Sequence, residues 1–491
     1  MAQHIAVDIG AGSGRIVAGT FSGKRLETQE VHRFTNGPVR TPDGQHWDVL
    51  RLFMETLEGI RAARAHGPIR SVGVDTWAVD YGLLDGADRL LGNPYHYRDA
   101  RTDGVRERVA SICSATEQFA RTGIAQLPFN TLYQLVAQAQ DPLLEHAATL
   151  LMIPDLLHFW LCGTRSAERT NASTSGALDL DGTWALDLLQ RVHVPTQLFL
   201  QPTPAGATLG VLRDDVRREC GVACIDVIAP ATHDTASAIV AIPAAADPNA
   251  EPFAFISSGT WSLFGLELAR PLATEDVRRA GFTNEAGFGG TTRFLTNIMG
   301  LWLLQECRRM WQLHGLSLPY DAFLAKVAAQ PSPGVVIDTE DPAFLRTDDM
   351  LAAIAAQLRR TGQRELHDAH DIARAIIEGL ALRYRAALND AERLAGIRVA
   401  AIHIVGGGAR NELLCRLAAN ACARVVIAGP FEATAIGNLL VQLIACGELD
   451  GIAQAREVVR NSTKLRTYEP LPDPALEANA RRLGEICAAR C

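Results

Sequence analysis

Two stretches, Ile5-Ala-Val-Asp-Ile-Gly-Ala-Gly-Ser-Gly-Arg-Ile-Val-Ala-Gly-Thr-Phe21 and Phe253-Ala-Phe-Ile-Ser-Ser-Gly-Thr-Trp-Ser-Leu-Phe-Gly-Leu-Glu267, decide how this chain folds. Each reads as an apolar strand, a tight turn of Gly, Ser and Thr, and a second strand. Glycine permits positive φ in such a turn and lets backbone N–H groups approach an anion closely. Two such turns, in matching places of two half-chains, predict a duplicated domain that binds one polyphosphate from both sides.

Length and composition set the broad class. A chain of 491 residues is longer than one hydrophobic core usually organises, so two domains of roughly 200–250 residues are expected. Hydrophobic residues make up 48% and charged residues 21%, which is typical of a globular protein. The net charge is −8 and the basic residues lie scattered, which argues against nucleic acid or an acidic membrane as partner.

The sequence also indicates a compartment. The first strand follows the N-terminus without a signal peptide's charged and apolar regions. No apolar stretch approaches the roughly 20 residues of a membrane span. We therefore expect a cytoplasmic protein, either a monomer or a small homo-oligomer. The ten cysteines are interpreted as reduced thiols, without a metal or a structural disulfide, because their spacings are not those of a zinc site.

The two halves of the chain repeat one order of elements. In the N-terminal half, the patterns predict helices and strands at 47–65 (helix), 71–75 (strand), 79–84 (strand), 150–161 (helix) and 225–228 (strand). In the C-terminal half, helices are expected at 301–313, 350–360 and 372–394, and a strand at 399–405 that ends in a glycine turn. The run 243–252 is rich in Pro and Ala and is the expected linker. The expected domains are therefore 1–242 and 253–491.

Three nucleotide-binding patterns compete for these turns. A Rossmann pattern would use Gly10, Gly12 and Gly14, but the spacing is wrong and a strand follows rather than a helix. A P-loop would use 19–24, but it has one residue too few between its glycines and no Ser or Thr after the lysine. The third pattern is that of actin-like ATPases: two duplicated domains, each with a phosphate hairpin, and a glycine turn for adenosine.

Further motifs resemble those of the FGGY family of carbohydrate kinases, and the resemblance covers nearly the whole chain. It rests on the segments 8–15, 75–80, 97–101, 128–134, 233–237, 258–262, 297–305 and 403–408. The segments at Asp75 and His233, combined with 297–305, are the most specific. Two positions depart from the wider family's pattern: Ala78 stands where Gly is expected, and Tyr97 where Trp is more frequent.

The resemblance implies a fold and a reaction. The fold is α/β, with two duplicated actin-like (ribonuclease H-like) ATPase domains around an interdomain cleft. The N-terminal domain would bind sugar and the C-terminal domain adenosine. The implied reaction uses ATP and Mg²⁺ to phosphorylate L-rhamnulose at O1, giving L-rhamnulose 1-phosphate and ADP in rhamnose catabolism. Another ketose or polyol (fuculose, xylulose, ribulose or glycerol) is the alternative substrate.

Two aspartates carry the chemistry. Asp234 lies where the last strand before the linker meets a helix, and the resemblance makes it the catalytic base for the sugar hydroxyl. Asp is also a frequent helix N-cap, and Thr232 is a second candidate for that cap. Asp8 sits inside an apolar strand, where an unpaired carboxylate is costly. Its partner is expected to be Mg²⁺, with the amides of the turn as the alternative.

The remaining site residues follow from the resemblance. The implied sugar contacts are Ala78, His233, Asp234, Thr235 and Asn297. The implied ATP contacts are Ala11, Gly12, Ser13, Gly14, Arg15, Thr260, Gln305 and Gly407. A charge such as Arg15 on an exposed strand can equally be a solvated residue.

Two other classes of function keep part of the pattern. An actin-like or chaperone-like ATPase would retain both phosphate turns without a sugar to activate. A nicotinamide-dependent dehydrogenase would need a helix after the first turn, and the hairpin there argues against it. Sugar-stimulated ATP consumption discriminates a kinase from both.

Overall fold

The computed structural model describes residues 2–139, 141–244, 251–316, 319–345 and 347–490. The chain divides into two compact units. Unit 1 comprises Met1–Pro248, Glu267–Phe294 and Ala433–Thr463, and unit 2 comprises Asn249–Leu266, Leu295–Glu432 and Lys464–Cys491. Unit 1 is therefore built from three separate segments of sequence. Most of the predicted linker, 245–250, lies outside the described residues.

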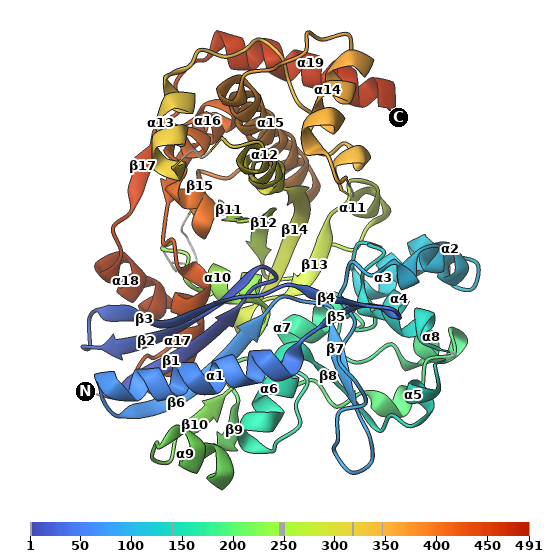
Figure 1. Cartoon of the computed structure of the whole chain (residues 1–491), viewed down its shortest axis with the longest axis vertical. Helices are drawn as coiled ribbons and strands as arrows, with labels where there is room; N and C mark the ends of the chain where they lie inside the picture. The colour runs from blue at the N-terminus through green and yellow to red at the C-terminus, as the bar shows by residue number, and fades with distance from the viewer. Residues whose placement is uncertain (1, 140, 245–250, 317–318, 346, 491) are drawn as a thin grey trace. The chain divides into compact units, whose positions relative to one another are not determined.

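Unit 1 contains a six-stranded mixed sheet (Figure 1). Its order is β3 (Leu26–Thr35), β2 (Ser13–Phe21), β1 (Gln3–Ile9), β6 (Ile69–Thr76), β10 (Asp226–Ile228) and β9 (Thr208–Val211). β1 is antiparallel to β2 and parallel to β6, and β10 is parallel to β6. All of β1 is buried, as expected for a strand covered by helices on both faces. The parallel strands bring their carboxyl ends to one edge.

Alternate residues of β1 and β6 meet different helices. Ile5, Val7 and Ile9 belong to a core with residues of α1 (Val49–Ala63) and α6 (Ile153–Cys162). The other face is covered by α17 (Ala433–Ala445), which also packs on α10 (Asp234–Val240). That face is partly polar: it carries His4 and Asp8 on β1 and Ser71 and Asp75 on β6, and α17 supplies amide side chains to it. The period of two in a strand produces this division.

The rest of unit 1 surrounds the sheet. It contains the hairpin β4 (Pro38–Thr41) and β5 (Gly44–Trp47), the pair β7 (Tyr81–Leu84) and β8 (Thr149–Met152), strand β13 (Thr283–Ala286), and the helices α2 (Val105–Ala110), α3 (Ala115–Thr122), α4 (Thr131–Ala137), α5 (Pro142–Glu145), α7 (Arg169–Ala172), α8 (Leu186–Arg191), α9 (Asp214–Cys220), α11 (Glu275–Arg279) and α18 (Ile452–Ser462). A second hydrophobic core forms around β7, β8 and α4.

A second sheet repeats this topology. Its order is β13, β14 (Thr292–Met299), β12 (Trp261–Leu268), β11 (Phe253–Ser258), β15 (Ala401–Val405), β16 (Val425–Ala428) and β17 (Arg466–Tyr468). β11 is antiparallel to β12 and parallel to β15, β15 is parallel to β16, and β17 is antiparallel to β16. The spatial order β14-β12-β11-β15-β16-β17 corresponds strand by strand to the order β3-β2-β1-β6-β10-β9 of the first sheet, and β13 is an additional edge strand. The predicted duplication of an α/β domain is confirmed.

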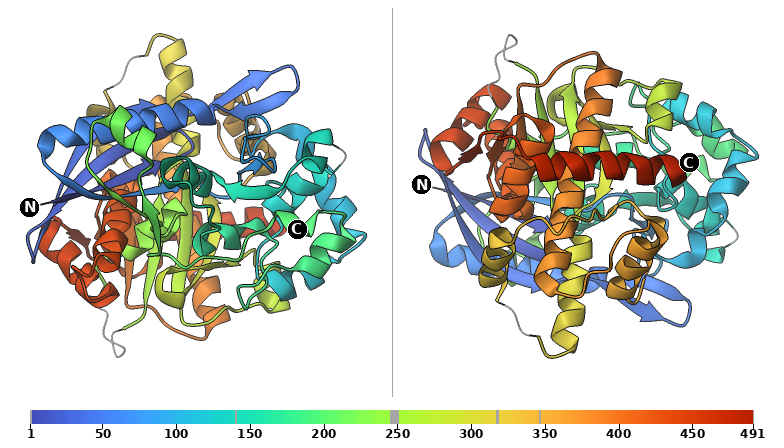
Figure 2. Two further views of the ribbon diagram at one scale, coloured as in Figure 1. Left: turned by 90° about the horizontal axis from the view of Figure 1, so that it is seen from below. Right: turned by 90° about the horizontal axis from the view of Figure 1, so that it is seen from above.

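Among the described residues, six α-helices complete unit 2. They are α12 (Trp302–Leu313), α13 (Tyr320–Ala329), α14 (Met350–Arg360), α15 (Ala369–Ala395), α16 (Glu412–Cys422) and α19 (Pro474–Arg490). The long helix α15 packs against α16 and α19 (Figure 2). Asp368 caps α15 by accepting from the amides of His370 and Asp371, so the run His367–Asp371 is a polar helix start. No described helix is long and apolar enough to cross a membrane.

Candidate active site

The first predicted phosphate turn links β1 to β2 in unit 1. The Gly10 amide donates to the Ser13 carbonyl at 2.9 Å, and Asn36 braces the turn through its amide to Gly12 O and its side chain to Gly10 O. Gly12 and Ser13 are exposed, so the turn is open to a ligand. At Gly14 a Cβ atom would lie 2.1 Å from the Phe34 ring, so only glycine fits there.

Asp8 and Arg15 form an ion pair beside this turn. Arg15 donates to Asp8 Oδ2 from Nε at 2.8 Å, and its Nη2 lies 2.7 Å from the same oxygen. The partner that a buried carboxylate requires is therefore supplied by the chain itself. The assignments of Asp8 to Mg²⁺ and of Arg15 to phosphate stay predictions. In the register of β1 and β6, Asp8 lies opposite Asp75.

Asp75 is a second buried carboxylate at this edge. Its Oδ2 accepts from Asn438 Nδ2 at 2.6 Å, while Oδ1 has no hydrogen-bond partner in the described part of the chain. Burial raises the pKa of Asp75 well above its usual value, and the Asp8 charge raises it further. An unpartnered buried carboxylate oxygen beside Asp8 fits a hard, oxygen-preferring cation such as Mg²⁺.

A buried chain of hydrogen bonds leads away from Asp75 along the face covered by α17. Asn438 Oδ1 accepts from Gln442 Nε2 at 2.6 Å, and Gln442 Oε1 accepts from Ser71 Oγ at 2.5 Å. His4 Nδ1 lies 2.7 Å from the same Ser71 oxygen. Because the single hydroxyl hydrogen of Ser71 is given to Gln442, His4 Nδ1 is the donor here. Side chains of α17 thus fix the orientation of Asp75.

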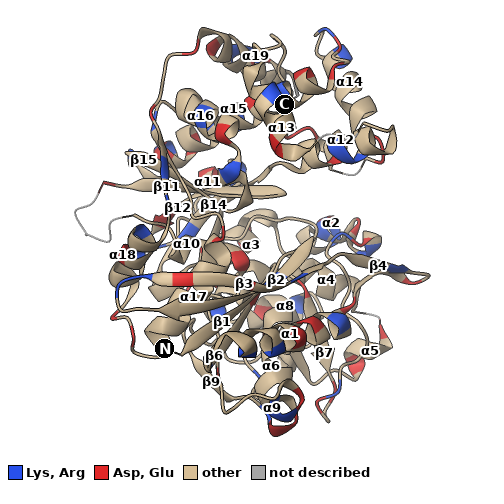
Figure 3. Ribbon diagram, turned by 60° about the vertical axis from the view of Figure 1, so that its left-hand side comes forward, with Lys and Arg blue, Asp and Glu red and all other residues tan. Residues whose placement is uncertain are grey.

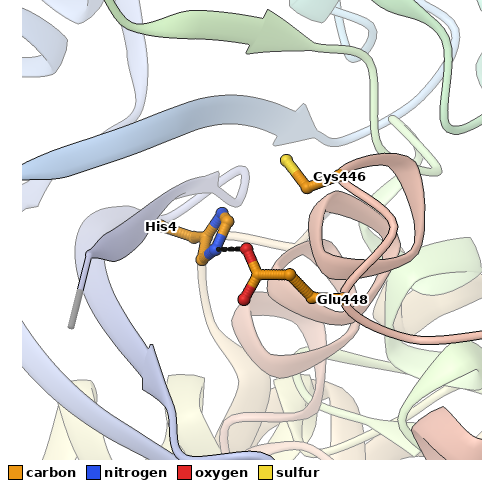
Figure 4. Close-up of side chains that lie close together, drawn as sticks. All are labelled: His4, Cys446 and Glu448. Carbon is orange, nitrogen blue, oxygen red and sulfur yellow. Dashed lines mark hydrogen bonds and ion pairs between the residues drawn. The ribbon is translucent and has the colours of Figure 1, made fainter.

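At the outer end of this chain, His4, Cys446 and Glu448 lie together (Figure 4). Their potential ligand atoms all lie within 4.8 Å of one another, and Glu448 Oε1 is 3.0 Å from His4 Nε2. Burial lowers the pKa of His4, and the Glu448 carboxylate opposes that shift. The contact between His4 and Glu448 accounts for the closeness of these side chains, so we assign no metal to them.

The loop before β7, which contains Ala78, has a strained backbone at Val79. The Asp80 amide donates to the Ala78 carbonyl at 3.0 Å, and the central residue of this turn, Val79, has φ +69°. A β-branched residue rarely adopts positive φ. The Asp80 carboxylate anchors the loop by accepting from the indoles of Trp47 at 2.6 Å and Trp77 at 2.9 Å. Burial raises the pKa of Asp80 to about 6. Backbone strain of this kind is concentrated at ligand-contacting loops.

His233 and Asp234 lie at the same edge of the sheet. The Thr76 amide donates to Thr232 O at 2.9 Å, which joins the end of β6 to the start of α10. His233 is the N-cap position of α10 and Asp234 its first residue, so neither predicted cap, Asp234 nor Thr232, occupies that position. The Asp234 side chain is 31% exposed. Burial raises its pKa, His233 opposes this, and the Asp8 charge adds to it.

Sequence reasoning missed a buried pair behind His233. Arg293 is fully buried, and its Nη1 lies 2.9 Å from both His233 Nδ1 and Glu285 Oε2. The burial of Glu285 raises its pKa, but the charge of Arg293, together with His233, outweighs this, and the net shift is downward. The available signal was a charged residue beside Phe294 and Leu295 in the strand 292–299; its partner could not be inferred from spacing.

Unit 2 brings three predicted ATP contacts together. The second phosphate turn follows β11, where Thr260 Oγ1 donates to Gln305 Oε1 at 3.3 Å. The glycine turn after the neighbouring strand β15 packs on the same place, since a Cβ at Gly408 would lie 2.0 Å from Ser258 Oγ. Gly407 is exposed, with open space at its Cβ position. Asn297, a predicted sugar contact, is half-buried on β14 in unit 2.

The remaining predicted residues lie in unit 1. Ala11 is half-buried in the first turn, and Thr235 follows Asp234, donating to Asp234 Oδ1 from its amide at 2.5 Å and from its hydroxyl at 3.1 Å. Basic and acidic side chains are interspersed over both units (Figure 3). Asp8, Arg15, Ala78, His233 and Asp234 thus gather at the carboxyl edge of one sheet, and the adenosine-side residues at the corresponding edge of the other.

Comparison with known proteins agrees with this arrangement. The models of the N-terminal and C-terminal domains of the FGGY family of carbohydrate kinases match residues 3–241 and 254–446. The chain belongs to the FGGY family of carbohydrate kinases, which confirms the resemblance. It is 40% identical to a rhamnulokinase of Oceanobacillus iheyensis, over 95% of this chain and 98% of that protein. It is 38% identical to a rhamnulokinase of Bacillus subtilis, over 95% of each.

Solved structures share the fold. A ligand-bound xylulose kinase from Lactobacillus acidophilus superposes with a TM-score of 0.81 at 15% identity, covering 100% of this chain and 98% of that one. A glycerol kinase from Plasmodium falciparum, solved with ADP, gives 0.77 at 12% identity, covering 100% and 97%. At such low identity these likenesses establish the fold alone.

Proposed function

We propose that this chain is a cytoplasmic kinase that transfers the γ-phosphoryl group of ATP to O1 of L-rhamnulose, giving L-rhamnulose 1-phosphate and ADP. The observation that carries the proposal is Asp234: a partly exposed carboxylate of raised pKa beside the first phosphate turn. The relatives named rhamnulokinase, 38–40% identical over nearly the whole chain, support the choice of sugar.

The residues take complementary roles in this proposal. Asp234 accepts the proton of the attacking hydroxyl, and its raised pKa makes it a stronger base than an exposed aspartate. Ala78, His233, Thr235 and Asn297 hold the sugar. Phosphoryl transfer depends mainly on positioning and charge stabilisation, which the backbone amides of the two turns supply.

We propose ATP contacts in unit 1 and, separately, in unit 2. We assign phosphate contacts to Ala11, Gly12, Ser13, Gly14, Arg15 and Thr260, and nucleoside contacts to Gln305 and Gly407. Asp8 would hold Mg²⁺, which neutralises developing charge on the phosphates when bound. The unpartnered oxygen of Asp75 beside Asp8 supports that site. We retain 1–242 and 253–491 as the two sequence domains.

The test is ADP release with Mg-ATP against a panel of L-rhamnulose, fuculose, xylulose, ribulose and glycerol. We expect turnover largely confined to L-rhamnulose, and a fall of about 10² or more in kcat for Asp234→Asn. Asp226→Asn is the matched control, because this aspartate is also part-exposed and lies on β10. Best activity on another sugar would overturn the substrate. ATP hydrolysis indifferent to every sugar would overturn the kinase.

A further inference from the structure

We propose that Arg293 and Glu285 are positioning residues that lock His233 as a neutral imidazole with its hydrogen on Nε2. His233 is then a hydrogen-bond donor at the site and cannot act as the base, which leaves that role to Asp234. This inference rests on the proposed function, and it assigns different chemistry to two adjacent titratable side chains.

The contacts of Arg293 fix its position. Its Nε donates to the Ala286 carbonyl at 2.9 Å, and its Nη2 donates to the Thr170 carbonyl at 3.2 Å. Its Nη1 reaches His233 Nδ1 and Glu285 Oε2, both at 2.9 Å. A guanidinium presents its donors in one rigid plane, so the two carbonyls hold Nη1 against the imidazole.

The hydrogen on His233 follows from this contact. A guanidinium nitrogen only donates, so His233 Nδ1 accepts and carries no hydrogen. That excludes both the imidazolium form and the tautomer with hydrogen on Nδ1. The ring hydrogen is therefore on Nε2, which lies 3.3 Å from Asp234 Oδ1.

Glu285 makes the lock possible. An arginine without exposed surface requires a counter-charge, and Glu285 supplies it from β13. The titratable groups in contact with His233 are Asp234 at 3.3 Å, Glu285 at 3.4 Å and Arg293. Two carboxylates alone would favour an imidazolium. Arg293 reverses that preference because it occupies the lone pair of Nδ1.

The lock also distinguishes the two oxygens of Asp234. Oδ1 accepts from the amide and the hydroxyl of Thr235 and faces the His233 hydrogen. In the described part of the chain, Oδ2 has no hydrogen-bond partner among the contacts of Asp234. Oδ2 is therefore the oxygen that accepts the proton of the sugar hydroxyl.

The experiment reads the imidazole directly. In protein labelled with ¹⁵N in histidine, the His233 signals are identified by their loss in His233→Asn. We expect one protonated and one unprotonated ring nitrogen at pH 7, with Nε2 protonated. Arg293→Lys keeps a positive charge but not the planar fork, so its His233 should titrate or change tautomer.

Kinetics provide the second readout. Arg293→Lys should lower kcat by roughly tenfold to a hundredfold, as expected for a misplaced catalytic group, with the KM for ATP nearly unchanged. Arg456→Lys is the matched control, because Arg456 is also buried and paired with a glutamate, Glu267, at 2.7 Å. It should leave both the His233 signals and kcat within about twofold.

Three results would overturn the inference. One is a wild-type His233 that is an imidazolium at pH 7 or carries hydrogen on Nδ1. Another is Arg293→Lys with wild-type signals and kcat. The third is Asp234→Asn with wild-type kcat, which removes the base assignment and the proposed mechanism. The ¹⁵N spectra still decide the lock in that case, so the two failures are distinguishable.

Discussion

Replacing Glu285 by Gln should strongly destabilise unit 1. The Arg293 side chain is 0% exposed and that of Glu285 is 9% exposed, with 2.9 Å between Nη1 and Oε2. The substitution preserves shape and one acceptor but leaves the arginine charge buried without a counter-charge. Breaking a buried ion pair in this way costs about 3–5 kcal/mol. Removing a pair on the surface typically costs about 0.2–1 kcal/mol.

The assay is urea unfolding followed by tryptophan fluorescence. For a unit of this size the free energy of unfolding falls by about 3 kcal/mol per molar urea, so the midpoint of the transition of unit 1 should fall by about 1–1.7 M. Glu117→Gln is the control: its pair with Arg191 is about 40% exposed on both sides, and the shift should stay below about 0.3 M. An equally small shift for Glu285→Gln would refute the reasoning.

Three more outcomes are expected. His158 is buried and accepts a backbone hydrogen bond, and burial lowers its pKa to about 3. Because only the unfolded chain binds the proton, the free energy of unfolding should fall by about 1.4 kcal/mol per pH unit as the pH drops from 6 to 4. In urea titrations, His158→Gln should abolish the contribution of His158 to this pH dependence. A Cβ at Gly437 would lie 1.7 Å from the Ser237 carbonyl oxygen, so Gly437→Ala should destabilise by about 3 kcal/mol, and a wild-type midpoint would contradict that packing. Gly408→Ala, crowding Ser258, should raise the KM for ATP about tenfold in the kinase assay, whereas an unchanged KM would argue against a nucleotide contact there.

Hydrophobic periodicity, turn residues and helix caps predicted those helices and strands that neighbouring residues in the sequence determine. The two glycine hairpins, the parallel strands after them and the helix capped by Asp368 all follow from period, turn residues and caps. The expected helix at 150–161 was wrong at its start, where Thr149–Met152 is a strand. A short apolar run fits a buried strand and a buried helix equally well; here pairing with β7 decides.

Contacts between distant segments could not be predicted. The ion pair of Asp8 with Arg15 on the neighbouring strand was not anticipated, and Mg²⁺ at Asp8 stays a prediction. Glu285 and Arg293 are ordinary charged residues until the fold places them behind His233. The helix α17 packs on β1 and β6, which lie near the other end of the sequence. Sequence spacing carries no information about such pairings.

The three-segment construction of unit 1 has a consequence for synthesis on the ribosome. The face of β1 and β6 that α17 covers lacks this helix until residues 249–432 have been translated. At roughly 5–20 residues per second this delay is on the order of ten to forty seconds. Throughout that time the nascent sheet presents Asp75 and its apolar neighbours without their helix. A fragment ending near residue 242 therefore lacks part of its domain, and Asp234 reaches its final surroundings only when nearly the whole chain has been made.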